Sequence, residues 1–468
     1  MTDNLRAPLA FAFMGILLAI VGFTQSWSVS LSIINLCLIS SIMAIGVNLQ
    51  WGYGGLFNAG VMGFTALGGL TAVLVSYDPV YEAWDKAGIG ILISAIILIL
   101  SITLVMFAYR NISSPQFRNT SIVLIVIAAL IGINSFYGPS IDVIESINPA
   151  KTGFLGGLGL PIVFSWVIAA FVAGLVAWVI GRITLRLRSD YLAIATLGIS
   201  EIVIAIVKHE DWLSRGVKNV SGLDRPVPYE IELQQSEWFI NLVEKINYAT
   251  LSSVQTISSR QELLNDLIIV SSGVFVKLCY VGLFLSVLLL IFYLSHLALN
   301  SPWGRMLRAI RDNEVAASAM GKNIFAQHLQ IFIIGSAISG IAGAMLTTLD
   351  GQFTPGSYRP LRFTFIIWLM VIVGGSGNNL GSIFGGFFVW FIWIEAEPLS
   401  IGFMNLLASG FEYDNPIRMH LLGSAAHLRL FIMGLLLLLA LRFMPRGVIP
   451  ERIPVSYTHL TLPTIMPV

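Results

Sequence analysis

Long apolar runs separated by short polar segments make up most of this chain of 468 residues. A membrane-spanning helix needs about 20 mostly apolar residues. Runs that approach or reach this length lie at residues 9–23, 28–49, 61–76, 88–108, 121–137, 161–180, 191–207, 273–299, 328–349, 363–374, 381–394 and 427–443. The runs at 363–374 and 381–394 are short enough to form one broken hairpin instead of two crossings. With no alternating strand pattern in competition, we predict an all-α, polytopic integral membrane protein with about ten to twelve membrane-crossing helices, some short or broken.

The composition agrees with this class. Hydrophobic residues make up 56% of the chain and charged residues only 11%, whereas soluble domains carry about 25% charged residues. The net charge of +1 offers no electrostatic support for a nucleic-acid partner. Cys37 and Cys279 lie inside apolar runs and the six histidines are scattered, so we expect neither a disulfide framework nor a metal site.

The distribution of Lys and Arg predicts the orientation, because positive residues concentrate in cytoplasmic loops. They cluster in four regions: Arg110 and Arg118; Arg182, Arg186 and Arg188; Arg305, Arg308, Arg311 and Lys322; Arg442, Arg446 and Arg452. If these regions are cytoplasmic, the runs alternate without conflict and both termini are cytoplasmic. The longest polar segment, residues 208–266, then lies outside. It is either a plain surface loop or a cap for docking and gating.

Residues 301–323, SPWGRMLRAIRDNEVAASAMGKN, form a basic amphipathic segment between two apolar runs. Ser301 suits a helix cap and Pro302 suits the first turn, while Gly321 marks the end of the expected helix. Met306, Ile310 and Ala317 fall on one face of it. A polar helix between two spans must lie outside the lipid core, where either anionic lipid or a partner protein can contact it.

Four segments occur in an order that resembles a known family. They are IMAIGVNLQWGYGGLFNAGVMGFTALGG (42–69), RLRSDYLAIATLGISEIV (186–203), residues 301–323, and MVIVGGSGNNLGSIFGG (370–386). Together they resemble the LivM-type branch of the branched-chain amino acid permeases, which are membrane subunits of ABC importers. The chain departs from the family pattern at Asn58, where Ser is usual, and at Asp312-Asn313-Glu314. The segment 217–223 lacks the family's Thr-Gly-Gly.

The resemblance implies one transmembrane permease domain over residues 1–454, with 208–266 as an external loop or cap. It also implies that 301–323 is a cytoplasmic coupling helix that contacts the ATPase through Arg305, Arg308, Arg311, Asp312, Glu314 and Gly321. The implied partners are cytoplasmic ABC ATPase subunits, a second, LivH-like permease subunit, a periplasmic solute-binding protein and membrane lipid.

The implied activity is translocation of branched-chain amino acids across the inner membrane, and not catalysis. The chain contains no G-x-x-x-x-G-K-[ST] phosphate loop, so we expect it to bind no cofactor and the partner subunits to hydrolyse ATP. Urea, short amides or other amino acids remain alternative cargoes. A stand-alone secondary transporter would need intramembrane charge coupling, which is sparse in this sequence.

Candidates for the translocation path are Tyr53, Gly55, Asn58, Gly60, Glu201 and Asn378. Each Gly inside a helix costs about 1 kcal/mol relative to Ala, so GYGGLFNAG and GGSGNNLG predict irregular backbone. Such backbone either lines a solute path or forms tight turns beside closely packed helices. Glu201 is an ionisable residue in an apolar run, which pairs with a neighbouring span, contacts substrate or reaches toward the membrane surface.

The last segment, VSYTHLTLPTIMPV (455–468), has no counterpart in the family. It resembles translated adapter sequence at the end of an assembled gene fragment. We therefore expect residues 455–468 to be a non-native tail.

Overall fold

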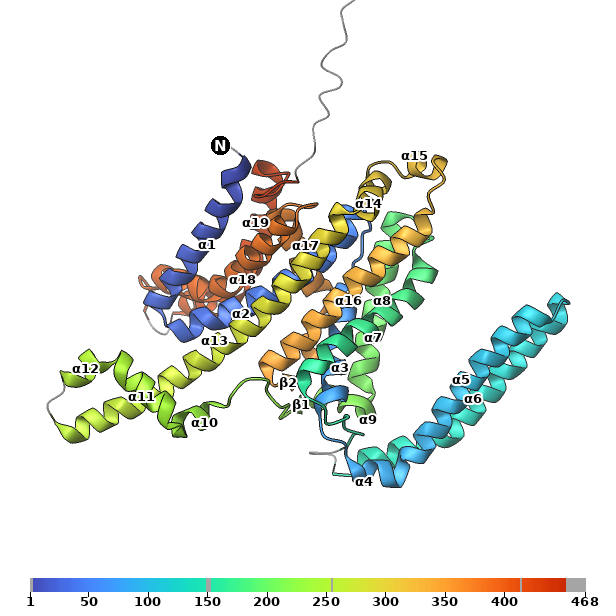
Figure 1. Ribbon diagram of the computed structural model, residues 1–468, viewed down its shortest axis with the longest axis horizontal. Helices are drawn as coiled ribbons and strands as arrows, with labels where there is room; N and C mark the ends of the chain where they lie inside the picture. Colours follow the sequence, from blue (N-terminus) through green and yellow to red (C-terminus); the bar gives the residue numbers. More distant parts are fainter. Residues whose placement is uncertain (1–2, 149–152, 254–255, 413–414, 452–468) are drawn as a thin grey trace, which may run out of the picture. The chain divides into compact units, whose positions relative to one another are not determined.

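The computed structural model describes residues 3–148, 153–253, 256–412 and 415–451, so the expected tail lies outside the described residues. In this part of the chain, helices account for almost all regular structure (Figure 1). Two short antiparallel strands, β1 (Val220–Ser221) and β2 (Gln352–Phe353), pair Val220 with Phe353.

Ten helical segments of the described chain are long and apolar enough to cross a membrane, which confirms the all-α polytopic class. They are α1 (Asp3–Thr24), α2 (Trp27–Val47) with its π-helical extension η1 (Asn48–Tyr53), α5 (Ile89–Asn111), α6 (Pro115–Ser146), α7 (Ile162–Thr184), α8 (Ser189–His209), α13 (Ile257–Asn300), α16 (Ile324–Asp350), α18 (Asn379–Ala408) and α19 (Pro416–Phe443). Two apolar helices are shorter, α3 (Val61–Ser76) and α17 (Pro360–Gly374). The runs at 363–374 and 381–394 belong to separate helices, α17 and α18.

The polar segment 208–266 folds into short elements. They are α9 (Asp211–Ser214), η3 (Gly216–Lys218), β1, α10 (Glu230–Gln235), α11 (Glu237–Ile246) and α12 (Tyr248–Ser252). Its last residues belong to α13, which already begins at Ile257. In α11, Phe239 and Val243 are buried one helical turn apart, so the amphipathic pattern gives this short helix a packing face.

Residue contacts divide the chain into two compact units. The single permease domain over residues 1–454 stays a prediction. Unit 1 comprises residues 1–57, 277–335 and 365–468, and unit 2 comprises residues 58–276 and 336–364. Each unit therefore combines segments that lie far apart in the sequence.

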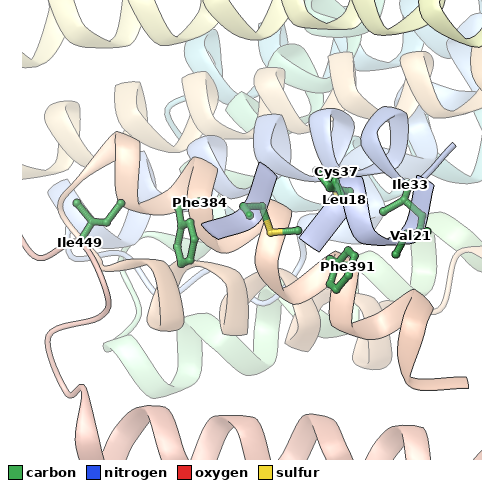
Figure 2. Close-up of a cluster of buried hydrophobic side chains, with 8 residues drawn as sticks. Leu18, Val21, Ile33, Cys37, Phe384, Phe391 and Ile449 are labelled. Carbon is green, nitrogen blue, oxygen red and sulfur yellow. The ribbon is translucent and has the colours of Figure 1, made fainter. Parts of the chain in front are cut away.

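In unit 1, α2 packs along α18, and α18 also packs against α19. Buried side chains from α1, α2, α18 and the segment after α19 form one apolar cluster, shown in Figure 2: Met14, Leu18, Val21, Ile33, Cys37, Phe384, Phe391 and Ile449. Cys37 is fully buried in this cluster as a small core side chain. Because α2 is buried along most of its second half, it is the central helix of the unit.

In unit 2, the short helix α3 packs against α7 and α8, and small residues permit its close approach to α16. A Cβ atom added at Gly68 would overlap the carbonyl oxygen of Gly340, and one added at Gly343 would overlap that of Thr65. Helices α5 and α6 lie side by side as a hairpin with mostly exposed apolar side chains (Figure 1). Such exposed apolar faces are expected where lipid is the solvent.

Candidate coupling site

The segment expected to form one helix over 301–323 is two helices, α14 (Pro302–Asp312) and α15 (Glu314–Ala319). The break is at Asn313, which is extended and whose side-chain oxygen accepts a hydrogen bond from the backbone N–H of Ala316 at 3.0 Å. Asn is a preferred N-cap residue, so its own side chain begins the second helix. The prediction of a continuous helix was therefore wrong, for a local reason.

At the two ends of this segment the structure agrees better with the roles predicted from the sequence. Pro302 occupies the first turn of α14, as predicted. Ser301 stands at the cap position, but its hydroxyl donates to the carbonyl of Ala298 and not to the helix start. Gly321 has φ of +75°, a backbone conformation that a residue with Cβ adopts poorly, and it lies just after α15.

The buried face of α14 differs by one residue from the expected one. Gly304, Leu307 and Ile310 are buried, and Ala317 is buried on α15. Met306, which was expected on the apolar face, is only half-buried, and Leu307 is buried there instead. The apolar face of α14 thus packs against its own unit and leaves the polar face exposed.

Arg311 of α14 turns inward. Its Nη1 donates to the backbone carbonyl of Gly52 and, at 2.9 Å, to the carboxylate of Glu451. The side chains of Arg311 and Glu451 are only 22% and 20% exposed. Burial alone would lower the pKa of Arg311, but hydrogen bonds and charge attraction from Glu451 and Asp312 outweigh burial and raise it. A permanently charged guanidinium therefore joins α14 to η1 and to the segment after α19.

Gly52 belongs to the first glycine-rich motif, and the backbone there forms a π-helical turn at the end of α2. Helix α2 continues as η1, which Gly54 caps, and Gly55 follows with φ of +70°. A Cβ atom at Gly52 would lie 2.5 Å from the amide nitrogen of Gly377, so only Gly fits. The motif thus packs directly against the second glycine-rich loop.

Asn48 on η1 holds the two glycine-rich segments together. Its side-chain oxygen accepts from the Gly377 N–H at 2.8 Å, and its amide group donates to Asn379 at 3.0 Å. The backbone N–H groups of Val448 and Ile449 donate to carbonyls at the end of α17. The loop 375–378 is therefore enclosed by η1, α17 and the segment after α19, all within unit 1.

Asn378 begins α18. Its side-chain oxygen accepts from the N–H groups of Leu380 and Gly381, and its amide donates to the carbonyl of Pro450. Gly375 and Gly377 have φ of +122° and +77°, which explains why glycine is needed in this loop.

The other path candidates lie in different environments. Tyr53 is buried, and Gly55 is beside Arg311. Asn58 is buried, and its side-chain oxygen accepts from the N–H of Gly60 at the start of α3. The turn bond of Asn58 and the helix cap of Asn378 agree with the tight-turn interpretation, and a role in a solute path stays a prediction.

Glu201 lies on α8, and Gly60 packs against α8. A Cβ atom at Gly60 would lie 2.5 Å from the carbonyl oxygen of Thr196, which is the close helix packing that the sequence offered as an alternative. Glu201 is exposed on α8. The structure therefore brings Tyr53, Gly55 and Asn378 into unit 1 and leaves Asn58, Gly60 and Glu201 in unit 2.

The remaining coupling candidates lie on the outer surface of the segment. Arg305, Asp312, Glu314 and Gly321 are exposed and Arg308 is half-buried. Two further side chains stand out, because Val315 and Met320 are apolar and each 80% exposed. They lie beside charged side chains, so this surface is a candidate for contact with a partner protein or with lipid.

Sequence reasoning did not identify Asn48, Glu451 or Lys277. The ammonium group of Lys277 on α13 donates to the hydroxyl of Ser28 at 2.6 Å and to its carbonyl at 3.1 Å. An ionisable residue in the apolar run 273–299 was a signal that pointed to Lys277. No local signal pointed to Glu451, which is 140 residues from Arg311. In the described ranges, no group of three or more His, Cys, Asp or Glu residues is placed to hold a metal ion.

Comparison with known proteins gives a consistent result. The family model described as "Branched-chain amino acid transport system / permease component" matches residues 152–441, more than half of the chain. The chain is 26% identical over 290 residues to a probable branched-chain amino acid transport permease protein LivM of Methanocaldococcus jannaschii, which covers 61% of this chain and 68% of that protein.

Two bacterial proteins are also similar. Both are named high-affinity branched-chain amino acid transport system permease protein LivM, and they are 27% (Salmonella typhimurium) and 29% (Escherichia coli) identical over 216 residues. The matched region is 46% of this chain and 46% of each of these proteins, so the chain spans less than half of their length. No solved structure matches the chain significantly.

Proposed function

This chain belongs to the permease family of branched-chain amino acid transport systems, and on that premise we propose that it is the membrane-spanning subunit of an ATP-driven ABC importer. It would carry branched-chain amino acids across the inner membrane. The names of its relatives support this cargo.

The observation that carries the proposal is the linkage of α14 to the glycine-rich ends of membrane helices through Arg311. The exposed face of α14 and α15 receives the ATPase, while the buried face and Arg311 move with unit 1. A displacement of α14 is therefore passed to η1 and, through Asn48, to the start of α18. Because interfaces of this kind are packed and bistable, a small shift at the docking surface can produce a discrete rearrangement.

The partners follow from the same arrangement. The chain has no phosphate-binding loop of its own, so cytoplasmic ABC ATPase subunits supply the energy. A second, LivH-like permease subunit completes the transmembrane pathway, and a periplasmic solute-binding protein delivers the cargo. The positive residues near α14 support a cytoplasmic position for that helix and for both termini.

Reconstitution tests the proposal. The chain is co-expressed with candidate ATPase, second permease and solute-binding subunits from its own genome, and uptake of radiolabelled leucine into proteoliposomes is measured with and without ATP. We expect ATP-dependent uptake that isoleucine and valine compete for. Uptake of urea or a short amide in place of leucine would support an ABC importer but contradict branched-chain amino acids as its substrate. Leucine uptake driven by an ion gradient without ATP would overturn the proposal.

The docking surface has a separate test. Val315→Asp and Met320→Asp place a charge at exposed apolar positions, so they should reduce co-purification with the ATPase without changing membrane insertion. Val217→Asp is the matched control, because Val217 is also exposed but lies in the segment expected outside. Normal ATPase binding by both variants would remove α15 from the contact.

A further inference from the structure

A polar cleft lies within unit 2, where the segment after β1 meets the end of α16. Its volume is about 330 Å³, and its walls include Leu223, Arg225, Tyr229, Glu230, Asp350 and Gly351. The β1–β2 pair and a hydrogen bond from the Leu223 N–H to the Gly351 carbonyl hold the two segments together. This volume is within the usual range of small-molecule sites, roughly 300–1,000 Å³.

Arg225 is held in position at one side of the cleft. Its Nη1 donates to both carboxylate oxygens of Glu230, at 3.2 and 3.3 Å, and its guanidinium carbon lies 5.8 Å from the ring centroid of Tyr229. A guanidinium has five N–H donors in a fork, and Glu230 engages only one nitrogen. The remaining donors can bind a carboxylate with the fork geometry that arginine favours.

Asp350 occupies an unfavourable position on the other side. It is the last residue of a 27-residue helix, where the helix dipole disfavours a negative side chain and favours a cation. Asp350 is exposed, and within the described ranges its carboxylate has no hydrogen bond or ion pair with the protein, so it is open to a ligand. An ammonium group bound here would satisfy the carboxylate and the carbonyl groups at the helix end.

We propose that this cleft binds the α-amino acid cargo, with Asp350 and the end of α16 holding its ammonium group and Arg225 holding its carboxylate. One small ligand carries both charges on adjacent groups, and the buried Leu223 and the ring of Tyr229 provide an apolar wall for an aliphatic side chain.

The membrane face at which the cleft opens is inferred from the proposed function. Since α16 is long enough to cross a membrane, Ile324 and Asp350 lie at opposite membrane faces. Ile324 follows the segment proposed to contact the ATPase, so Asp350 lies at the face from which an importer receives its cargo. The cleft is thus an entry site for the released amino acid.

Ligand analogues test the two charge contacts separately. Binding to the purified full-length chain in nanodiscs, without ATPase or binding protein, is titrated by saturation-transfer NMR with leucine, leucinamide and 4-methylpentanoate. Asp350→Asn should weaken leucine and leucinamide binding about tenfold or more and leave 4-methylpentanoate unchanged. Arg225→Gln should weaken leucine and 4-methylpentanoate and leave leucinamide unchanged.

Asp224→Asn is the matched control, because Asp224 is an exposed carboxylate of the same segment that does not line the cleft. It should bind all three ligands as the wild-type chain does. If the wild-type chain shows no saturable leucine binding, or if all variants bind equally, the cleft is not an amino acid site. If the analogue pattern holds but no ATP-driven uptake is found, the proposed function fails and the site stands. If uptake is ATP-driven and both cleft variants transport leucine normally, the site fails and the function stands.

Discussion

Replacement of Arg311 by Gln should separate α14 from the glycine-rich helix ends of unit 1. The change removes the positive charge that joins Glu451 and the Gly52 carbonyl, and it retains part of the side-chain volume. Glu451→Gln removes the other charge of the pair. Together with the double variant, these changes form a mutant cycle that isolates the interaction between the two side chains.

The expected size follows from burial. A hydrogen bond to a charged group contributes about 1.5–3 kcal/mol, whereas an exposed ion pair contributes about 0.2–1 kcal/mol. Because both side chains of the pair are about four-fifths covered, we expect a coupling energy near the lower end of the first range, about 1.5 kcal/mol. Arg311→Gln alone should cost about 2–3 kcal/mol, since its bond to the Gly52 carbonyl is also lost.

The assay is unfolding of the purified protein in mixed detergent micelles, followed by ATP-driven uptake for each variant. Arg305→Gln is the control, because Arg305 is an exposed arginine of the same helix whose bond to the Asn300 carbonyl is long, at 3.3 Å. It should change stability by less than about 0.5 kcal/mol. Arg311→Gln should also keep its ATPase association and lose uptake.

Two outcomes would contradict a role for Arg311 in transmitting motion. A coupling energy below about 0.5 kcal/mol would class the pair with exposed ion pairs. Normal uptake by Arg311→Gln, with the expected loss of stability, would show that the linkage holds the fold and does not transmit motion.

Three further predictions concern packing, backbone conformation and orientation. Gly68→Ala should lower stability by about 1–3 kcal/mol in the same unfolding assay, because its Cβ atom would overlap a backbone carbonyl of α16. Gly198→Ala is the control, because it has open space around it and should not lower stability. Equal stability of the two variants would contradict the close approach of α3 and α16. Gly321→Val should reduce uptake, because its φ of +75° strains a residue with Cβ, and Gly321→Asn should be tolerated better; indistinguishable uptake would show that this conformation is dispensable. An impermeant thiol reagent should label Glu237→Cys in intact cells and Arg305→Cys only after permeabilisation, and the reverse pattern would invert the proposed orientation.

Part of the candidate site was predictable because it depends on neighbouring residues. The amphipathic segment 301–323, Pro302 in its first turn and the left-handed Gly321 all follow from local backbone preferences. The cap by Asn313 that splits the segment is equally local, and the type of residue at this position was a signal for the break.

The apolar runs alone predicted a chain of membrane-crossing helices, because lipid requires long apolar runs whose backbone groups bond within the helix. Two pairings could not be read from the sequence. Arg311 turns inward to residues 259 and 140 positions away, and Asp350 shares a cleft with Arg225. These pairings depend on how helices distant in sequence pack. A helix depends on residues close in sequence, whereas a polar contact between helices depends on two distant segments and on the packing that brings them together.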